Sequence, residues 1–365
     1  MKGRVLSMFM ALVLIFCLAA CGSGINESYE VALITDIGDI DDRSYNQALW
    51  EGIRGYSEQN SVSCRYYRPA KKQTDEFLKS IDRAVSNGAK IVICCGSVFE
   101  KAVEHAQQQY NEVKFVLMQG DLKPSANTCV VNFSELEAGF LAGYAAVKEG
   151  FTSIGFQGGE AEPAVIRYGF GYIQGAEYAA YELNLSPSSV TLKYNYAGSF
   201  DASPELQARA ELWYEMGTQV IFACTGSVCA SVIAAAESAE NRWVVGSETD
   251  MSGFSETVIY SAEKCFSSAV YTIIEKFYAG EYPGGESLIL GADRQGIGLE
   301  TANSRWKNFE ESNYKEIMQK LSSDTDGIRT SLLSDSDASD FSMQSSSDFM
   351  AFFGTQYVLI ELAVN

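Results

Sequence analysis

Residues 35–52 read Thr35-Asp36-Ile37-Gly38-Asp39-Ile40-Asp41-Asp42-Arg43-Ser44-Tyr45-Asn46-Gln47-Ala48-Leu49-Trp50-Glu51-Gly52. Before this stretch, Glu30–Thr35 is a short apolar run of the length of a buried strand. Within and after it, Tyr45, Leu49 and Ile53 recur at helical spacing, so one helix face is predicted to pack on a sheet. A strand that passes through a polar turn into an amphipathic helix is the opening unit of an α/β fold with parallel strands.

The same alternation of short apolar runs and longer amphipathic runs continues from Tyr29 to about Leu299. It predicts parallel strands that are covered by helices on both faces. The predicted strands are Glu30–Thr35, Lys90–Cys95, Lys114–Met118, Thr128–Asn132, Thr152–Phe156, Val190–Tyr196, Gln219–Ala223, Trp243–Gly246, Val258–Tyr260 and Ser287–Leu290. Helices are predicted to begin at Ser97 and Ser134, each followed three residues later by glutamate as in a capping box, and at Ser203-Pro204.

The length of the chain predicts more than one folded unit. About 300 residues exceed what one hydrophobic core usually supports, so two lobes are expected, with the first change of lobe near Gly150. Residues 322–365 are rich in serine and aspartate, as in Ser334-Asp335-Ser336-Asp337, and are predicted to form a flexible extension. Residues 349–364 turn apolar again, for which the pattern supplies no reason.

The N-terminus has the layout of an export signal. Lys2 and Arg4 precede an apolar run from Val5 to Ala20, which is shorter than the roughly 18 residues that a membrane-spanning helix needs. The sequence Leu18-Ala19-Ala20-Cys21-Gly22 resembles the lipobox of bacterial lipoproteins. Residues 1–20 are therefore interpreted as a signal peptide, Cys21 as the lipidated residue and residues 21–28 as a tether, which predicts a lipid-anchored protein on the outer face of the cell membrane.

Charge and cysteine usage exclude several classes of function. The formal net charge is −20, and loss of Lys2 and Arg4 with the leader would make it −22. A chain this acidic without a basic tract is repelled by phosphate backbones, so nucleic acid is excluded as a partner. The cysteines lack the paired spacing of a zinc site and are interpreted as buried thiols, so neither a metal nor a cofactor is expected.

The carboxyl ends of the predicted strands define the candidate site, because ligands of open parallel sheets bind there. These ends carry Asp36, Gly96-Ser97, Gln119-Gly120, Phe133, Gly158-Gly159, Gly198-Ser199-Phe200, Thr225-Gly226-Ser227, Glu248, Asp250 and Ser261 to Lys264. The set combines glycines, aromatic rings, carboxylates and one lysine. Such a mixture suits a ligand with a flat ring and several hydroxyl groups.

The run from Thr35 to Gly52 resembles the N-terminal motif of the basic membrane protein family, lipoproteins related to purine nucleoside receptors of ABC transporters. Tyr45 stands where a phenylalanine is usual. Further stretches agree in order, over roughly residues 29–320: Glu137-Ala138-Gly139-Phe140-Leu141-Ala142-Gly143, Pro163-Ala164-Val165-Ile166-Arg167, Gly198-Ser199-Phe200, Val220-Ile221-Phe222-Ala223 and Gly296-Ile297-Gly298-Leu299.

The resemblance implies a type I periplasmic-binding-protein fold, with two Rossmann-like lobes, three crossovers and a cleft that closes on ligand. Residues 29–148 with about 262–286 would form the N-terminal lobe, and residues 149–261 with about 287–321 the C-terminal lobe. The implied function is that of a substrate-binding lipoprotein that captures a purine nucleoside and delivers it to the permease and ATPase subunits of an ABC transporter.

The resemblance also implies roles for individual residues. Tyr45 and Phe200 would sandwich a base, and Asp36 and Asn46 would line the N-terminal lobe. Gly226 would offer backbone near the ligand. The ribose hydroxyls would lie near Glu248 or Asp250, together with Lys264.

Two residues of this candidate site depart from the family pattern. Gln119 and Glu248 each stand where the family usually has an aspartate. An amide both donates and accepts hydrogen bonds whereas a carboxylate only accepts, so Gln119 predicts a changed preference for the base or for the class of ligand.

Other interpretations of the same residues stay open at this point. Tyr45 could be part of the core and Phe200 could cap a strand edge, while the aspartates from Asp36 to Asp42 lack the order of an EF-hand and are interpreted as a helix cap. A receptor for a sugar or another small ligand on the same fold is the main alternative. A nucleoside-processing enzyme is a further one, although His105 is the only histidine and no GxSxG or HExxH motif occurs.

Overall fold

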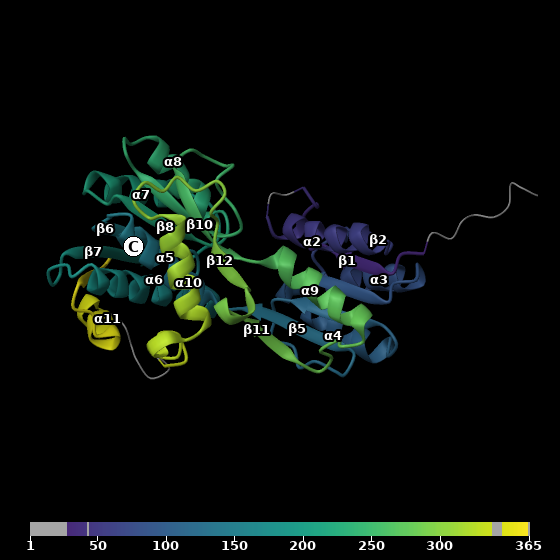
Figure 1. Cartoon of the computed structure of the whole chain (residues 1–365). Helices are drawn as coiled ribbons and strands as arrows, with labels where there is room; N and C mark the ends of the chain where they lie inside the picture. The colour runs from purple at the N-terminus through teal and green to yellow at the C-terminus, as the bar shows by residue number, and fades with distance from the viewer. Residues whose placement is uncertain (1–27, 42–43, 338–344, 364–365) are drawn as a thin grey trace, which may run out of the picture.

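The structure is a computed structural model that describes residues 28–41, 44–337 and 345–363. The predicted signal peptide, Cys21 and nearly all of the tether lie outside these ranges. Figure 1 shows two lobes side by side, each built from a sheet with helices packed on it. Within the described ranges, no helix has both the length and the apolar character that crossing a membrane requires.

The first lobe contains a six-stranded sheet of order β11-β5-β4-β3-β1-β2, in which all neighbouring strands are parallel. Alternate residues of β1 face opposite sides: Val31 and Leu33 pack with α2 and α9, whereas Ala32 and Ile34 pack with α3 and α4. The elements are β1 (Val31–Ile34), α2 (Tyr45–Asn60), β2 (Cys64–Tyr67), α3 (Thr74–Ser86), β3 (Ile91–Cys95), η1 (Ser97–Phe99), α4 (Glu100–Gln109), β4 (Lys114–Met118), β5 (Thr128–Phe133), α9 (Phe266–Ala279) and β11 (Ser287–Leu290).

The second lobe contains a seven-stranded sheet of order β12-β10-β9-β8-β6-β7-β13. Only β12 runs antiparallel to its neighbour among these strands. The elements are α5 (Glu135–Lys148), β6 (Ser153–Gly158), α6 (Pro163–Glu182), β7 (Val190–Tyr196), α7 (Pro204–Glu215), β8 (Val220–Cys224), α8 (Val228–Glu237), β9 (Trp243–Glu248), β10 (Val258–Lys264), η2 (Ala292–Arg294), β12 (Ile297–Leu299), α10 (Glu311–Ser322), η3 (Thr325–Gly327), α11 (Ser346–Phe353) and β13 (Val358–Leu362).

The chain passes between the two sheets three times: from β5 into α5, from β10 into α9, and from β11 into β12. Two α/β lobes joined by three crossovers are the type I periplasmic-binding-protein fold that the resemblance implied. Parallel sheets covered on both faces are also what the alternating apolar and amphipathic runs predicted.

The predicted lobe boundaries are wrong in two places. β10 continues in the second sheet as far as Lys264, so the second crossover lies at Cys265 and not at residue 262. β11 pairs with β5 and therefore belongs to the first lobe, although residues 287–290 had been assigned to the C-terminal lobe. Three strands were not predicted, because β2 is partly exposed and polar, β12 has only three residues and β13 lies in the extension.

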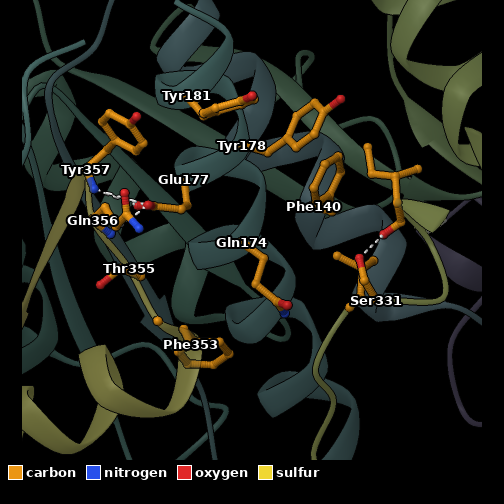
Figure 2. Close-up of a pocket in the computed structure, with 13 residues that line it drawn as sticks. Phe140, Gln174, Glu177, Tyr178, Tyr181, Ser331, Phe353, Thr355, Gln356 and Tyr357 are labelled. Carbon is orange, nitrogen blue, oxygen red and sulfur yellow. Dashed lines mark hydrogen bonds between the residues drawn. The ribbon is translucent and has the colours of Figure 1, made fainter. Parts of the chain in front are cut away.

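The prediction that residues 322–365 are flexible is wrong for the described part of the extension. β13 adds a parallel strand to the edge of the second sheet beside β7, and Phe349 of α11 packs against the rings of Phe170 and Tyr194. The Glu177 carboxylate accepts hydrogen bonds from the backbone N–H groups of Gln356 and Tyr357, as Figure 2 shows, and from that of Val358. The apolar character of residues 349–363 is thus the signature of a helix and a strand that cover the sheet edge.

Helices α5 and α6 pack so closely that glycine is required where they cross. A Cβ atom on Gly143 would overlap the carbonyl oxygen of Tyr172, and one on Gly175 would overlap that of Phe140. These close contacts fix α5 and α6 relative to each other. It explains the glycines in the stretch from Glu137 to Gly143 by packing alone.

All three predicted helix starts are confirmed: Ser203 and Ser134 are the N-caps of α7 and α5, and Ser97 begins the 3-10 turn that leads into α4. Only Ser203 caps its helix through its side chain, whose Oγ accepts a hydrogen bond from the backbone N–H of Leu206. The capping boxes at Ser97 and Ser134 are wrong, because neither serine side chain caps its helix. The backbone N–H of Ser134 donates to Leu290 and the Glu137 carboxylate accepts from the backbone N–H of Ala292. Both bonds tie the first crossover to the third.

Candidate functional site

A cleft of about 760 Å³ lies where the carboxyl ends of strands from both sheets face each other. Such a volume falls within the range of small-molecule sites, roughly 300–1,000 Å³. The first lobe contributes residues at or just after the ends of β3, β4 and β5, and the second lobe contributes residues at or after the ends of β6, β7, β8, β9 and β10. The polar and aromatic residues of its wall include Ser97, Gln119, Asn132, Glu135, Arg167, Phe200, Thr225, Glu248 and Lys264.

Three residues of the cleft wall have a backbone conformation that side-chain-bearing residues rarely adopt. Gln119, Thr225 and Glu248 have φ angles of 64°, 70° and 69°. They end or directly follow β4, β8 and β9. A positive φ is especially unfavourable for a β-branched residue such as Thr225. Because strain of this kind gathers at ligand sites, the three angles mark this cleft independently of any resemblance.

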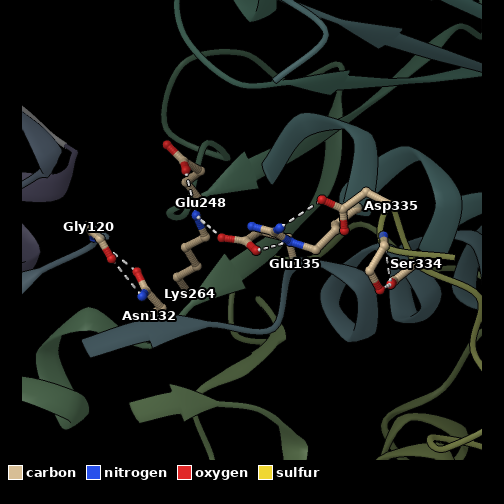
Figure 3. Close-up of polar contacts among 9 residues, drawn as sticks. Gly120, Asn132, Glu135, Glu248, Lys264, Ser334 and Asp335 are labelled. Carbon is tan, nitrogen blue, oxygen red and sulfur yellow. Dashed lines mark hydrogen bonds and ion pairs between the residues drawn. The ribbon is translucent and has the colours of Figure 1, made fainter. Parts of the chain in front are cut away.

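The turn at Gln119 is held by the side chain of Asn132. The Asn132 amide accepts a hydrogen bond from the backbone N–H of Gly120 (3.0 Å) and donates one to the Gly120 carbonyl (2.9 Å), as Figure 3 shows. Both backbone groups of Gly120 are therefore occupied by one residue of the neighbouring strand β5. The clamp fixes the strained backbone that presents Gln119 to the cleft.

Thr225 was not selected as a site residue from the sequence, although the strand end that contains it was recognised. Its backbone N–H donates to the Ser247 hydroxyl (3.0 Å), which holds the strained backbone in place. Its own hydroxyl is buried and has no hydrogen-bond partner among the described residues. A buried hydroxyl in the wall of a cleft is a group that a ligand can satisfy.

Lys264 is the buried centre of the charged side of the cleft. Its Nζ lies 3.0 Å from Glu135 Oε1 and 3.0 Å from Glu248 Oε1 (Figure 3), and none of its side chain is exposed. Burial by itself would lower the pKa of Lys264, but the two carboxylates raise it above its usual range. The ammonium also lies 5.5 Å from the centre of the Tyr168 ring, a cation–π contact.

Glu135 connects this lysine to an arginine. Its second oxygen, Oε2, lies 3.0 Å from Arg167 Nε, and Arg167 Nη1 lies 3.2 Å from Asp335 Oδ2. Burial would raise the pKa of Glu135, but the charges of Lys264 and Arg167 hold it below its usual value. Glu248, Lys264, Glu135, Arg167 and Asp335 thus form one chain of alternating charges. The strand-end rule could not find the last three, because they lie in helices and in the extension.

The structure brings four of the nine predicted ligand-binding residues into the cleft wall: Gln119, Phe200, Glu248 and Lys264. Asp250 lies instead in an adjoining hollow of about 520 Å³, which Lys264 also lines. The Asp250 carboxylate accepts hydrogen bonds from the Ser252 N–H and from Asn303.

The remaining predicted residues are not among those that line the cleft. Asp36 accepts hydrogen bonds from the Gly38 N–H (2.7 Å) and from Asn46 Nδ2 (3.0 Å), so these residues organise the turn after β1. The Gly226 backbone is pressed against Phe200, since a Cβ atom there would lie 2.8 Å from the Phe200 carbonyl oxygen. Gly226 therefore positions the aromatic residue.

Tyr45 lies directly behind the cleft wall. Its hydroxyl donates to the carbonyl of Met118 (2.6 Å), and its ring packs edge-on against Phe266 with ring centres 4.6 Å apart. A Cβ atom on Gly96, which lines the cleft, would lie 3.9 Å from the Tyr45 ring. Burial raises the pKa of Tyr45, and the charges of Cys95, Glu248 and Asp36 add to this effect. In this conformation the structure does not bring Tyr45 and Phe200 together in one cavity wall.

A second hollow, of about 380 Å³, lies between α6 and the C-terminal extension (Figure 2). Its polar groups are largely used within the chain. Glu177 receives backbone N–H groups, Gln174 pairs with the backbone of Leu333, and the Ser331 hydroxyl donates to Ile328. Because these groups already have partners, this hollow offers a ligand less than the cleft does. No cluster of three or more potential metal ligands occurs among the described residues.

Comparison with known proteins agrees with this geometry. A family described as "ABC transporter substrate-binding protein PnrA-like" matches residues 29–328. The "ABC transporter nucleoside-binding protein BmpA" of Lactococcus lactis subsp. cremoris is 26% identical, over 84% of this chain and 95% of its own length. "Basic membrane protein D" of Borreliella burgdorferi is 28% identical, over 86% of this chain and 89% of its own length.

Solved structures share the fold. An ABC transporter solute-binding protein from Aeropyrum pernix superposes with a TM-score of 0.61 at 20% identity, covering 90% of both chains. Another from Conexibacter woesei superposes with a TM-score of 0.66 at 16% identity, covering 81% of this chain and 97% of its own.

Proposed function

Because the chain belongs to the family of PnrA-like ABC transporter substrate-binding proteins, we propose that its cleft captures a purine nucleoside and presents it to the permease of an ABC transporter. The observation that carries the proposal is the cleft wall itself. Its residues include the Phe200 ring, the Gln119 amide, the unpaired Thr225 hydroxyl and the Lys264–Glu248 ion pair. The L. lactis relative that is named for nucleoside binding adds support.

The wall divides by chemistry in a way that suits the two halves of a nucleoside. The Phe200 ring offers a face on which a base can stack, and the Gln119 amide can both donate to and accept from the edge of the base. Glu248 ends β9 in the same lobe as Phe200, and its partly exposed carboxylate, which Lys264 holds in place, is a ready acceptor for ribose hydroxyls. Tyr45 supports the wall from behind in the observed conformation. A ligand held between the two lobes would bind the closed state best and shift the population toward that state.

The charge of the cleft favours an uncharged ligand. Its wall contains five carboxylates but only two cations: Glu100, Asp121, Glu135, Glu162 and Glu248 against Arg167 and Lys264. The helix starts that point into it, which would otherwise attract anions, carry Glu100, Glu135 and Glu162. A ligand that bears a phosphate is therefore opposed by like charge, so a nucleoside fits and a nucleotide does not.

A thermal-shift screen of the lipid-free protein tests the proposal. Purine nucleosides are expected to raise the melting temperature, because a ligand at about 100 times its Kd adds about 2.7 kcal/mol to the free energy of unfolding. Adenosine, guanosine, inosine, pyrimidine nucleosides, sugars and amino acids form the panel. If a sugar or an amino acid raises the melting temperature and no nucleoside does, the assignment of a nucleoside ligand is overturned. The assignment as a small-ligand receptor then still stands.

The same panel separates binding from turnover. A nucleoside that is bound without reaction is recovered intact after long incubation with the protein. Release of free base, measured by chromatography, would instead favour the alternative of a nucleoside-processing enzyme. The Asp36 carboxylate gives little support to this enzyme alternative. It already accepts hydrogen bonds from Gly38 and Asn46, and it does not line the cleft.

We further propose that Cys21 carries lipid and anchors the receptor on the outer face of the cell membrane. The Cys21→Ala variant is expected to lose fatty-acid labelling completely and to appear in the soluble fraction or remain unprocessed, because removal of the thiol removes the site of acylation. Metabolic labelling with a radioactive fatty acid measures this. Cys64→Ala is the matched control and keeps the label, and a wild-type protein without label would contradict the anchor.

A further inference from the structure

The C-terminal extension reaches a residue of the cleft wall, Arg167, through the side chain of Asp335, and we propose that Asp335 is a specificity-determining residue. By keeping Arg167 paired, Asp335 makes the cleft reject anionic ligands. The inference rests on the proposed function, because it concerns how the same cleft tells an uncharged nucleoside from its phosphorylated form. Asp335 lies beyond residues 29–328, the part of the chain that matches the family.

Arg167 is the residue through which Asp335 acts. It lies in the first turns of α6 and lines the cleft, and one third of its side chain is exposed. Its guanidinium is positioned by two carboxylates: Nε faces Glu135 Oε2 at 3.0 Å and Nη1 faces Asp335 Oδ2 at 3.2 Å. One positive charge is therefore matched by two negative ones.

The extension is built to hold Asp335 at this place. The Gln174 amide donates to the carbonyl of Leu333 (2.8 Å) and accepts from its N–H (2.8 Å), which fixes the chain two residues before Asp335. On the same segment, the backbone N–H of Ser334 donates to Asp337 (2.8 Å), which closes a turn around Asp335. Figure 3 shows Ser334 and Asp335 at the end of the chain of charges that begins at Glu248.

The two cations of the cleft differ in how firmly they are neutralised. Lys264 is fully buried between Glu135 and Glu248, so a ligand cannot reach it without displacing a carboxylate. Arg167 is partly exposed, and a guanidinium binds phosphate well when its donors are free. Without Asp335, Arg167 would be the group on which an anionic ligand could gain affinity. Pairing with Asp335 removes that gain and leaves the affinity for a neutral ligand unaffected.

The experiment compares adenosine with adenosine 5′-monophosphate as probes, by calorimetric titration of the wild type and of Asp335→Asn. The wild type is expected to prefer adenosine, as measured by the Kd of the monophosphate divided by the Kd of adenosine. This ratio should fall about threefold to tenfold in the variant, since a charge-assisted hydrogen bond contributes in this range. The change should come from tighter binding of the monophosphate, with adenosine affinity within about twofold. A merely structural role would weaken both ligands alike. Asp335→Glu is expected to restore the wild-type preference.

The matched control is Glu256→Gln, which also removes one carboxylate from an arginine, Arg305, but in an exposed pair that does not line the cleft. It has the same effect on net charge and should leave the preference unchanged. A second readout needs no ligand: labelling of Arg167 by phenylglyoxal, followed by peptide mass spectrometry, should be severalfold faster in Asp335→Asn.

The outcomes separate the two proposals. If the wild type binds no purine nucleoside of the thermal-shift panel, the proposed function fails, and the labelling rate alone decides whether Asp335 restrains Arg167. If the wild type binds adenosine but Asp335→Asn keeps the full preference, the inference about Asp335 is overturned while the proposed function stands. Faster labelling with an unchanged preference overturns it as well, because a released Arg167 would then not attract the anion.

Discussion

Replacing Lys264 with methionine is expected to lower the free energy of unfolding by about 3–5 kcal/mol at pH 7, the range found when one partner of a buried ion pair is removed. The substitution keeps the volume of the side chain but leaves Glu135, which is 5% exposed, and Glu248 facing each other without the cation between them. Denaturant unfolding measures the effect. Binding of any ligand in the cleft should weaken too, since Lys264 lines it.

Lys315→Met is the matched control for this variant. Lys315 pairs with Glu311 in an exposed helical contact, so its removal should leave the unfolding free energy essentially unchanged. The double variant Lys264→Met with Glu135→Gln should recover part of the loss, because it removes the carboxylate that is left buried and unpaired. Equal losses in Lys264→Met and Lys315→Met would show that the buried network does not stabilise the fold.

The pH dependence of this loss follows from the pKa shifts. Since the folded state holds the pKa of Glu135 below its usual 4.5, the stability that the pair contributes is full above that value. It disappears as the pH falls through the lower pKa of the folded state. The pKa of Lys264 is raised above its usual 10.5, so its contribution is full below that pH. The difference between wild type and Lys264→Met should therefore be constant from about pH 5 to 10 and narrow on acidification.

The sequence predicted most strands of both sheets because their apolar runs are long and buried. β4 and β7 have the predicted bounds, and β1, β3 and β8 differ by one residue or two. The sequence could not assign β11 to its sheet, because the residues of a four-residue strand do not indicate in which of the two lobes the strand pairs. β13 was missed because the composition of residues 322–348 indicates disorder, while its partner residues in β7 lie 168 positions away in the sequence.

The candidate site was predictable where it follows strands. Gln119, Phe200, Glu248 and Lys264 could be placed in one cleft because parallel strands bring their carboxyl ends together. Glu135 and Arg167 could not be placed, since they lie on helices whose approach depends on the glycine contacts between α5 and α6. Tyr45 was predicted to sandwich a base with Phe200, but the structure shows its hydroxyl bonded to Met118 and its ring packed on Phe266 behind the cleft wall.

Tyr45 is for this reason a poor residue with which to test stacking, and Phe200 is a good one. Phe200 lines the cleft from the loop after β7 and is only half-buried, so its removal leaves little of the core unfilled. Its position is set from two sides by glycines: a Cβ atom on Gly159 would overlap the ring, and one on Gly226 would press on the Phe200 backbone. The ring is thus held ready before a ligand arrives, and binding need not order it.

Phe200→Ala is therefore expected to weaken purine nucleoside binding about tenfold to a hundredfold, because stacking of a base on an aromatic side chain is worth roughly 1–3 kcal/mol. Isothermal titration with the nucleoside from the thermal screen gives the Kd, and the melting temperature of the free protein should stay near that of the wild type. Phe254→Ala is the matched control: Phe254 is an exposed phenylalanine of the same lobe, 48% accessible, that does not line the cleft. Phe200→Tyr should bind nearly as the wild type does, since it keeps the ring. If Phe200→Ala and Phe254→Ala bind with the same affinity, the base does not stack on Phe200 and the orientation proposed for the ligand is wrong.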